Sequence, residues 1–452
     1  VQAAIAIGLL ELLPCSLGQE ILMSQAPDLF KLVLLPITSG ARCLDGSPGG
    51  YYWKKGVGSN ASRWIVHFEG GAWCLDENDC LARSQPSNQD ETGSSKAWRA
   101  SLPGLPDMDA GAHGIMSSDP DVNPDFHDWT KAHINYCDGA SFSGDRLEPL
   151  NTSSGQLLYF RGRRILDAAL ESLLQNGLSS ATHVIMKGNS AGALAIYLHA
   201  DYIRSRLPSD IDYVALADSG MFLKVPTWTG EPGYEAHFRY IVEMQNITDL
   251  NKQCVMQHPE AERWRCFMAP YIVQYITSPV FITQAMYDSW QTVNILDVDC
   301  EGGTCTDSRK KKAVMNFAAE MQTALQRAPQ DSGVFAKPCY VHGMVNNDWL
   351  WSGWKVNHTS MRDAFSYWWR TRKGLNLLES GAIGSDCPWP GGGAPSSHDL
   401  VINVAVVAVC CLLVLACTYM LYRRCQKREH KGGEVSALEK PLHAEPAEGW
   451  PI

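Results

Sequence analysis

Positive charge is scarce in this chain. Its 452 residues include 38 Lys and Arg against 48 Asp and Glu, which gives a net charge of −10. A protein that binds a nucleic acid backbone needs a basic stripe, and the body of the sequence has none. Nucleic acid is therefore excluded as a partner.

Metal-binding motifs are missing as well. The sequence contains neither a paired C-x-x-C nor an H-E-x-x-H motif, which are spacings that commonly bind zinc. We therefore expect the chain to use no metal and no cofactor.

The N-terminal stretch is apolar and short. Residues 3–17 end in the small-residue pattern Ser16-Leu17-Gly18, which suits cleavage by signal peptidase. A buried N-terminal helix is the alternative. We expect a signal peptide over residues 1–19. Because no initiator Met or basic segment precedes it, we expect the given sequence to start inside that peptide.

A second apolar segment lies near the C-terminus. Residues 400–422 contain no charged residue and are long enough to cross a hydrocarbon core of about 30 Å. A Pro/Gly linker, 388–399, precedes them, and a tail that begins with two arginines, 423–452, follows. Basic flanks mark the cytosolic side, so we expect a single-pass type I membrane protein. A buried helix is the alternative.

Cysteine usage agrees with an oxidising compartment, because an even number of Cys lies in the predicted lumenal body, residues 24–387. Three pairs are close in sequence: Cys74 with Cys80, Cys254 with Cys266, and Cys300 with Cys305. Two longer bridges of undetermined pairing are then left for Cys43, Cys137, Cys339 and Cys387.

Four N-x-S/T sequons are candidate glycosylation sites in a protein of the secretory pathway. They begin at Asn60, Asn151, Asn246 and Asn357. We expect the ectodomain to be monomeric.

Short apolar runs alternate with helical patterns through the body. Residues 162–174 carry apolar side chains at helical spacing, and the apolar run 183–187 follows them. This alternation is typical of a mostly parallel sheet flanked by helices, so we predict an α/β-hydrolase-like α/β fold. Further strands are expected at 51–53, 63–68, 133–136, 213–217, 279–285 and 339–343, a helix at about 311–327, and long surface loops over 81–130.

Ser190 is the candidate nucleophile. It lies in Gly-Asn-Ser-Ala-Gly, 188–192, between the apolar run and a stretch of helix-forming residues. A serine in such a strand–turn–helix is held in a strained conformation that exposes its hydroxyl at the carboxyl end of the sheet. The alternative is a small-residue turn that only lets a helix approach a strand.

A glycine-rich loop follows the strand 63–68. Glycines at such a strand end let backbone N–H groups face a developing negative oxygen, as in the oxyanion hole of α/β hydrolases. We predict that the N–H groups of Gly71, Ala72 and Ala191 form this hole. A simple strand-ending turn is the alternative.

The partners of the serine are expected at later strand ends, in the order acid and then base. His342 is the best base, because it follows an apolar run and precedes a glycine. Asp218 and Asp288 both lie at predicted strand ends. We favour Asp288 as the acid, with Asp218 organising the neighbouring loop.

Several motifs then occur in one order. They are HFEGGAWC (67–74), NYCDGASFSGD (135–145), GNSAGA (188–193), ADSGMF (217–222) and YDSWQ (287–291). Together with RCLDGSPGGYY (42–52), they make residues 42–387 resemble the pectin acetylesterase family and its animal relatives, the Notum-type carboxylesterases. The resemblance implies an α/β-hydrolase-type fold and a Ser190, Asp288, His342 triad.

The predicted function is a serine esterase that removes O-acetyl groups from a cell-wall or cell-surface polysaccharide through an acyl-enzyme. The YDSWQ and CDGASFSGD strings look more like the polysaccharide-acting branch of the family. Two alternatives stay open. One is a Notum-like deacylase of lipidated protein, and the other is an inactive ectodomain that binds a glycan or a protein partner.

Overall fold

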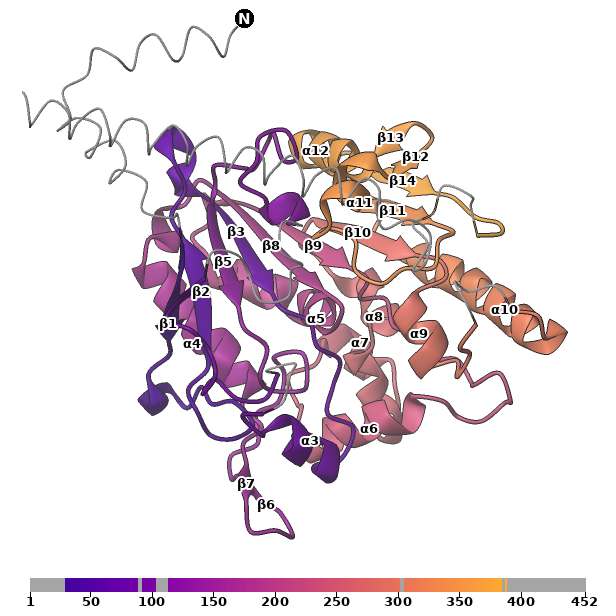
Figure 1. Ribbon diagram of the computed structural model, residues 1–452, viewed down its shortest axis with the longest axis horizontal. Helices are drawn as coiled ribbons and strands as arrows, with labels where there is room; N and C mark the ends of the chain where they lie inside the picture. The colour runs from indigo at the N-terminus through magenta and orange to yellow at the C-terminus, as the bar shows by residue number, and fades with distance from the viewer. Residues whose placement is uncertain (1–28, 88–91, 103–112, 301–304, 384–386, 388–452) are drawn as a thin grey trace, which may run out of the picture. The chain divides into compact units, whose positions relative to one another are not determined.

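A sheet of ten strands organises the molecule (Figure 1). The computed structural model describes residues 29–87, 92–102, 113–300, 305–383 and 387. The strand order across the sheet is β14-β11-β10-β9-β8-β3-β5-β2-β1-β4. The strands are β1 (Phe30–Leu34), β2 (Gly50–Lys54), β3 (Arg63–Phe68), β4 (Ser101–Leu102), β5 (Thr130–Ile134), β8 (His183–Asn189), β9 (Asp212–Asp218), β10 (Val280–Ala285), β11 (Gly333–Lys337) and β14 (Leu375–Leu378).

The sheet is mainly parallel, as the sequence predicts. From β14 to β5 every neighbouring pair is parallel, whereas β2, β1 and β4 complete one edge with antiparallel pairs. Parallel strands direct their carboxyl ends to the same edge of a sheet. Loops that follow β3, β8, β9 and β10 can therefore contribute to one site.

Helices cover both faces of the sheet. They are α3 (Glu77–Arg83), α4 (Gly162–Gln175), α5 (Ala191–Arg206), α6 (Glu235–Met244), α7 (Lys252–Met256), α8 (Ala269–Ile272), α9 (Ser289–Asn294), α10 (Ser308–Leu325), α11 (Asp348–Gly353) and α12 (Met361–Thr371). Two short hairpins pair β6 (Leu150–Asn151) with β7 (Leu157–Leu158) and β12 (Lys355–Val356) with β13 (Thr359–Ser360).

Alternate residues of each central strand enter two separate hydrophobic cores. In β8, Val184 and Met186 pack in the core that contains α4, α5 and α10, whereas Ile185 packs against α11 and α12 on the other face. Side chains of a strand point alternately to the two faces of its sheet. Because both faces are covered, the strand reads as a continuous apolar run.

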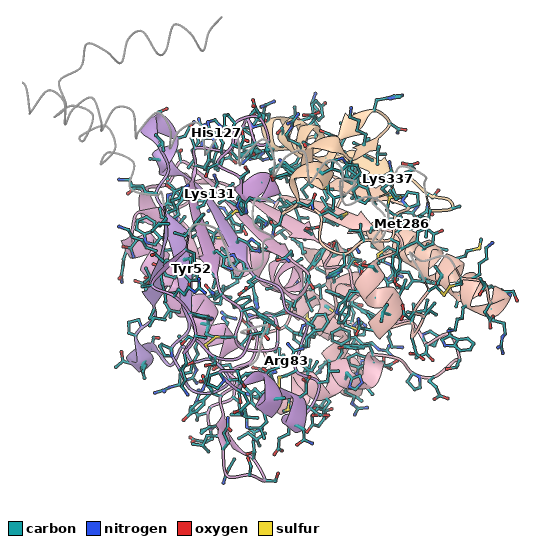
Figure 2. All side chains as sticks on the ribbon, viewed as in Figure 1. Tyr52, Arg83, His127, Lys131, Met286 and Lys337 are labelled. Carbon is teal, nitrogen blue, oxygen red and sulfur yellow. A yellow bond between two sulfur atoms is a disulfide. The ribbon has the colours of Figure 1, made fainter. Side chains whose placement is uncertain are left out.

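Charged side chains inside the sheet have partners. Lys131 of β5 is fully buried, and its ammonium group donates to the carbonyl groups of Ser117 at 3.0 Å and His127 at 2.5 Å. Lys131 and His127 are labelled close together in Figure 2. The hydrogen bonds offset the cost of removing the charge from water.

Two sequence predictions need correction. Residues 339–343 are not a strand, because β11 (Gly333–Lys337) stops before them and Pro338 has no N–H to continue the ladder. His342 therefore lies in a loop. The segment 81–130 is also not simply a surface loop, since Phe126 and Trp129 are buried in the core between the sheet and α12.

The described helices include none that is long and apolar enough to cross a membrane. The predicted signal peptide (1–19), linker (388–399), transmembrane segment (400–422) and tail (423–452) lie outside the described residues.

Candidate active site

Ser190 lies in the sharp turn between β8 and α5. Its backbone angles are φ 54° and ψ −125°, and α5 begins at the next residue. A side chain in this strained region is held in place by its surroundings. Here the Ser190 N–H donates to the carbonyl of Asp218 at 2.8 Å, and the side chain is almost buried. The predicted strand–turn–helix is therefore present around Ser190.

Gly192 permits this turn. A Cβ atom on it would lie 2.1 Å from the carbonyl oxygen of Phe68 and 2.6 Å from that of Glu69. No side chain fits at such distances, so only glycine lets the start of α5 pack against the end of β3. This contact brings Ser190 next to the glycine-rich loop.

His342 and Asp288 form a close pair. Nδ1 of His342 lies 2.9 Å from Oδ2 and 3.0 Å from Oδ1 of Asp288. The Asp288 carboxylate is fully buried and also accepts from the Gln284 side chain at 2.9 Å and the Gln291 N–H at 3.0 Å. A carboxylate fixed in this way orients the imidazole and keeps its Nδ1 protonated.

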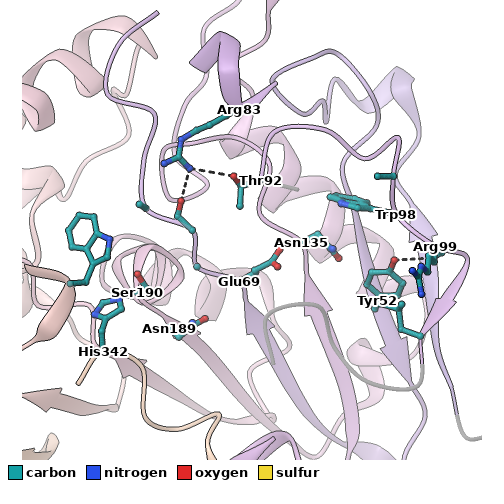
Figure 3. Close-up of a pocket in the computed structure, with 16 residues that line it drawn as sticks. Tyr52, Glu69, Arg83, Thr92, Trp98, Arg99, Asn135, Asn189, Ser190 and His342 are labelled. Atoms are coloured by element: carbon teal, nitrogen blue, oxygen red, sulfur yellow. Dashed lines mark hydrogen bonds between the residues drawn. The ribbon is translucent and has the colours of Figure 1, made fainter. Parts of the chain in front are cut away.

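The second ring nitrogen of His342, Nε2, can accept a proton. Among the described residues, Nε2 of His342 is buried and has no hydrogen-bond partner. His342 and Ser190 line the same cavity and lie near each other in Figure 3. The arrangement therefore brings a hydroxyl, an imidazole and a carboxylate together at one edge of the sheet.

The charges at this edge of the sheet change the pKa of His342. Burial by itself lowers the pKa of the imidazole, but the charge of Asp288, its hydrogen bond and the charge of Asp218 outweigh burial. The pKa of His342 is consequently raised above its usual value of 6.5. A raised pKa makes the neutral imidazole a stronger base.

Asp218 organises the loop after His342. Its Oδ2 atom accepts from the backbone N–H groups of Met344 at 2.8 Å and Val345 at 2.9 Å, and its Oδ1 accepts from the Thr283 hydroxyl at 2.9 Å. Asp218 thus fixes the backbone of this loop, whereas Asp288 is the carboxylate that contacts the imidazole.

Side chains of other segments fix the peptide groups of the loop after β3. Arg83 donates to the carbonyl of Gly71 at 2.7 Å, and the Tyr136 hydroxyl donates to the carbonyl of Ala72 at 2.7 Å. In a trans peptide the N–H points away from the carbonyl, so the N–H of Ala72 is directed away from Arg83. Gly71 has φ 151°, where a Cβ atom would lie 2.8 Å from Tyr136. Gly71 and Ala72 line the cavity together with Ser190.

The cavity has a volume of about 790 Å³ and runs along the carboxyl ends of the strands. In Figure 3, His342 and Ser190 lie at one end and Tyr52 and Arg99 at the other. Its wall combines polar and apolar side chains in similar measure. The lining residues for which the sequence analysis predicts no role are Tyr52, Glu69, Gly70, Arg83, Thr92, Ala97, Trp98, Arg99, Leu102, Asn135, Asn189 and Trp290.

Only some of these cavity residues carry a signal in the sequence. Glu69 and Asn135 directly follow β3 and β5, and polar residues at the ends of parallel strands are recognisable candidates. Arg83 ends the short helix α3, whereas Trp98 and Arg99 lie in an irregular segment. No hydrophobic periodicity indicates that these three residues line a cavity.

A comparison with models of known protein families identifies the family of this chain. The family model described as "Pectinacetylesterase" matches residues 23–394. The chain belongs to the pectinacetylesterase family. It is accordingly a carboxylic ester hydrolase.

Relatives of this pectinacetylesterase family member come from plants and animals. It is 34% identical to Pectin acetylesterase 5 of Arabidopsis thaliana over 80% of this chain and 84% of the relative. It is 29% identical to the palmitoleoyl-protein carboxylesterase NOTUM of Homo sapiens over 83% of this chain and 75% of the relative. The structure of the Wnt deacylase Notum from Drosophila is similar, with a TM-score of 0.68, 26% identity and coverage of 79% of this chain and 99% of that one.

Five disulfides join cysteines of the part of the esterase that the structure describes. The three short pairs link the cysteines that spacing predicts, Cys74–Cys80, Cys254–Cys266 and Cys300–Cys305. The two longer bridges are Cys43–Cys137 and Cys339–Cys387. Such bridges are typical of proteins of the secretory pathway.

One group in the described residues resembles a metal site. Cys254, His258 and Cys266 place their ligand atoms within 4.8 Å of one another. Both cysteines are joined in a disulfide and offer no thiolate, so the group does not fit zinc.

The four sequon asparagines differ in accessibility. Asn151, Asn246 and Asn357 are exposed, whereas Asn60 is half-buried and its amide donates to Asp128 at 2.7 Å. Glycosylation therefore stays a prediction, with Asn60 as the least accessible site.

Proposed function

We propose that Ser190, His342 and Asp288 are the catalytic triad of this esterase. The single observation that carries the proposal is the His342–Asp288 pair at 2.9 Å, in the same cavity as Ser190 and with no partner for Nε2 of His342 among the residues that the structure describes. Nε2 takes the proton of the Ser190 hydroxyl as its oxygen attacks the ester carbonyl. Asp288 stabilises the imidazolium that forms.

The negative oxygen of the tetrahedral intermediate is then bound by backbone N–H groups. We assign these to Gly71, Ala72 and Ala191, which surround Ser190 from the loop after β3 and the start of α5. The imidazolium returns its proton to the leaving alcohol, which leaves an acyl-enzyme. His342 next activates a water molecule that releases the acid and restores Ser190.

The substrate we propose is an O-acetylated, pectin-like polysaccharide. The cavity extends away from Ser190, and its lining includes the polar side chains of Glu69, Arg99 and Asn135 beside aromatic ones. This combination suits hydroxylated sugar rings. The relatives named as pectin acetylesterases support the same class.

The packing of aromatic side chains near His342 favours a substrate with a short acyl group. Trp73, Phe222 and Phe238 are buried and pack against one another, with ring centroids 4.6 Å apart for Trp73 and Phe222 and 4.9 Å apart for Trp73 and Phe238. Phe222 and Trp290 also contact the His342 ring. The apolar region beside the imidazole is thus filled by protein, whereas a long acyl chain needs an open apolar channel.

Removal of a longer acyl group from a lipidated protein is the second candidate, because the fold is similar to that of a Wnt deacylase. A catalytically inactive ectodomain that binds a glycan or a partner is the third. An intact Ser190, His342 and Asp288 arrangement favours an active enzyme over the third.

We propose the secretory pathway as the location of the esterase. The disulfides support it, and we retain as proposals the signal peptide at 1–19, the type I membrane anchor at 400–422, glycans at the sequons and a monomeric ectodomain. Action on the cell wall or the cell surface would follow from this orientation.

The test is labelling with a serine-reactive organophosphonate followed by mass spectrometry. We expect one modified peptide that contains Ser190. Ser190→Ala should remove the label and lower kcat for 4-nitrophenyl acetate by roughly 10⁴-fold or more. Labelling at another serine, or unchanged activity of the variant, would refute the assignment.

A further inference from the structure

Three neighbouring side chains, His67 of β3 and Lys187 and Asn189 of β8, form a hydrogen-bonded row that reaches the cavity at Asn189. Nε2 of His67 lies 2.9 Å from Oδ1 of Asn189, and Nδ1 of His67 lies 2.9 Å from Nζ of Lys187. His67 and Lys187 are fully buried. Asn189 is only partly buried, directly precedes Ser190 and lines the cavity.

The row fixes the orientation of the Asn189 amide. The ammonium group of Lys187 can only donate, so Nδ1 of His67 must accept. In a neutral imidazole the proton is then on Nε2, which donates to an oxygen. The oxygen of the Asn189 amide therefore faces His67, and the NH₂ group is held on the other side.

That NH₂ group is available to a ligand. Among the described residues, the only hydrogen-bond partner of the Asn189 side chain is His67, and it uses the oxygen. Figure 3 shows Asn189 beside Ser190, on the side where the cavity extends toward Glu69 and Asn135. The row thus presents a donor of fixed direction next to the nucleophile.

Asn135 supplies a second, independent observation. It is 2% exposed, and its buried Oδ1 has no partner among the described residues. The residue lines the same cavity as Asn189. An unpartnered buried amide costs free energy unless a ligand completes it.

We propose that Asn189 and Asn135 bind the hydroxylated alcohol part of the ester, and that His67 and Lys187 are positioning residues for Asn189. A hydroxyl group both donates and accepts, so a sugar ring can satisfy the Asn189 NH₂ group and the Asn135 oxygen together. This inference rests on the proposed esterase function. It assigns specificity for a polyhydroxylated alcohol to named residues.

The sharpest variant is Asn189→Asp. The aspartate keeps an oxygen for His67 and has the same shape, but the donor is lost. We would measure kcat/KM for acetylated pectin oligosaccharides and for 4-nitrophenyl acetate, whose alcohol part has no sugar hydroxyl groups. The ratio of the two values removes any effect of the added charge on the chemical step that both substrates share.

We expect the ratio to fall roughly 3- to 10-fold, chiefly through KM for the oligosaccharides. Asn189→Ala, which adds no charge, should lower the ratio similarly. Asn176→Asp is the matched control, because Asn176 caps α4 and bonds to Tyr51 and Ser172 instead of lining the cavity. Its ratio should equal that of the wild type.

The positioning role has a separate readout. In the His67→Leu background the Asn189 amide is free to rotate, so adding Asn189→Asp should change the ratio much less than it does alone. Fully additive effects would contradict the role of His67. Melting temperatures of all variants confirm that the folded protein is compared.

The outcomes separate the two proposals. If activity on 4-nitrophenyl acetate survives Ser190→Ala, the proposed function fails. If Ser190→Ala abolishes both activities but Asn189→Asp and Asn189→Ala keep the wild-type ratio, or lower both substrates equally, the inference on Asn189 is wrong while the esterase assignment stands.

Discussion

Asp218 is connected to His342 through the backbone, because its carboxylate accepts a 2.8 Å hydrogen bond from the N–H of Met344, two residues after the imidazole. The same oxygen accepts from Val345 at 2.9 Å. A carboxylate that touches no reacting group thus determines where the loop with His342 lies. It also adds to the rise in the pKa of His342.

Asp218→Asn should therefore act on rate and on pH dependence together. The amide can replace only one of the oxygens, so a buried N–H or hydroxyl group loses its acceptor at a cost of about 1–3 kcal/mol. We expect kcat to fall about 10-fold or more and the acid limb of the pH–rate profile to move to lower pH. Asp212→Asn, at the exposed start of β9, is the control and should change neither.

The wild-type pH profile follows from the raised pKa of His342. The base must be neutral to accept the Ser190 proton, so kcat/KM should rise with pH through a midpoint above 6.5. An acid limb centred well below that value would contradict the Asp288 pairing. Rates of 4-nitrophenyl acetate hydrolysis between pH 5 and about 9 give the midpoint.

Asp288→Asn tests the source of that shift. The charge and the carboxylate acceptor of Nδ1 are both lost, so that only the charge of Asp218 still opposes burial, which lowers the pKa of His342. We expect kcat to fall by about 10³- to 10⁴-fold and the acid limb to move to lower pH. A normal rate in this variant would show that the imidazole needs no anionic partner.

The sequence predicted the local parts of this site well, for a physical reason. The turn at Ser190 depends on β8, α5 and small residues within about twenty positions, and hydrophobic periodicity reports such local structure. The order of Ser190, Asp288 and His342 follows from parallel strand ends that meet at one edge. The structure places His342 and Asp288 in contact.

The remaining parts depend on contacts between distant segments. His67 and Lys187 lie in runs that read as apolar strands, and only the adjacency of β3 and β8, set by tertiary packing, pairs them. Arg83 reaches the loop after β3 from the end of helix α3, and no local pattern indicates this contact. β11 ends just before Pro338. The apolar residues between Pro338 and His342 make the strand seem to continue, so the sequence does not reveal that His342 lies in a loop.

The disulfides should differ in their contributions to stability. In the chain-entropy account, a bridge that closes a longer loop removes more freedom from the unfolded chain. Cys43–Cys137 closes 94 residues and Cys254–Cys266 closes 12. Replacing both cysteines by serine should lower the free energy of unfolding by about 4–5 kcal/mol for the first and about 3 kcal/mol for the second. Denaturant titrations of the two double variants, compared with the wild type, measure these values.

The length of the acyl group tests the substrate proposal. Because Trp73, Phe222 and Phe238 fill the apolar region beside His342, kcat/KM should be highest for acetyl esters and fall by about 10-fold or more for octanoyl esters of the same alcohol. Phe222→Ala should open space and raise the octanoyl-to-acetyl ratio. Leu147→Ala, at an exposed leucine, should leave that ratio unchanged. A wild-type enzyme that prefers octanoyl esters would favour the Notum-like deacylase instead, since the aromatic side chains would then have to move aside to admit the chain.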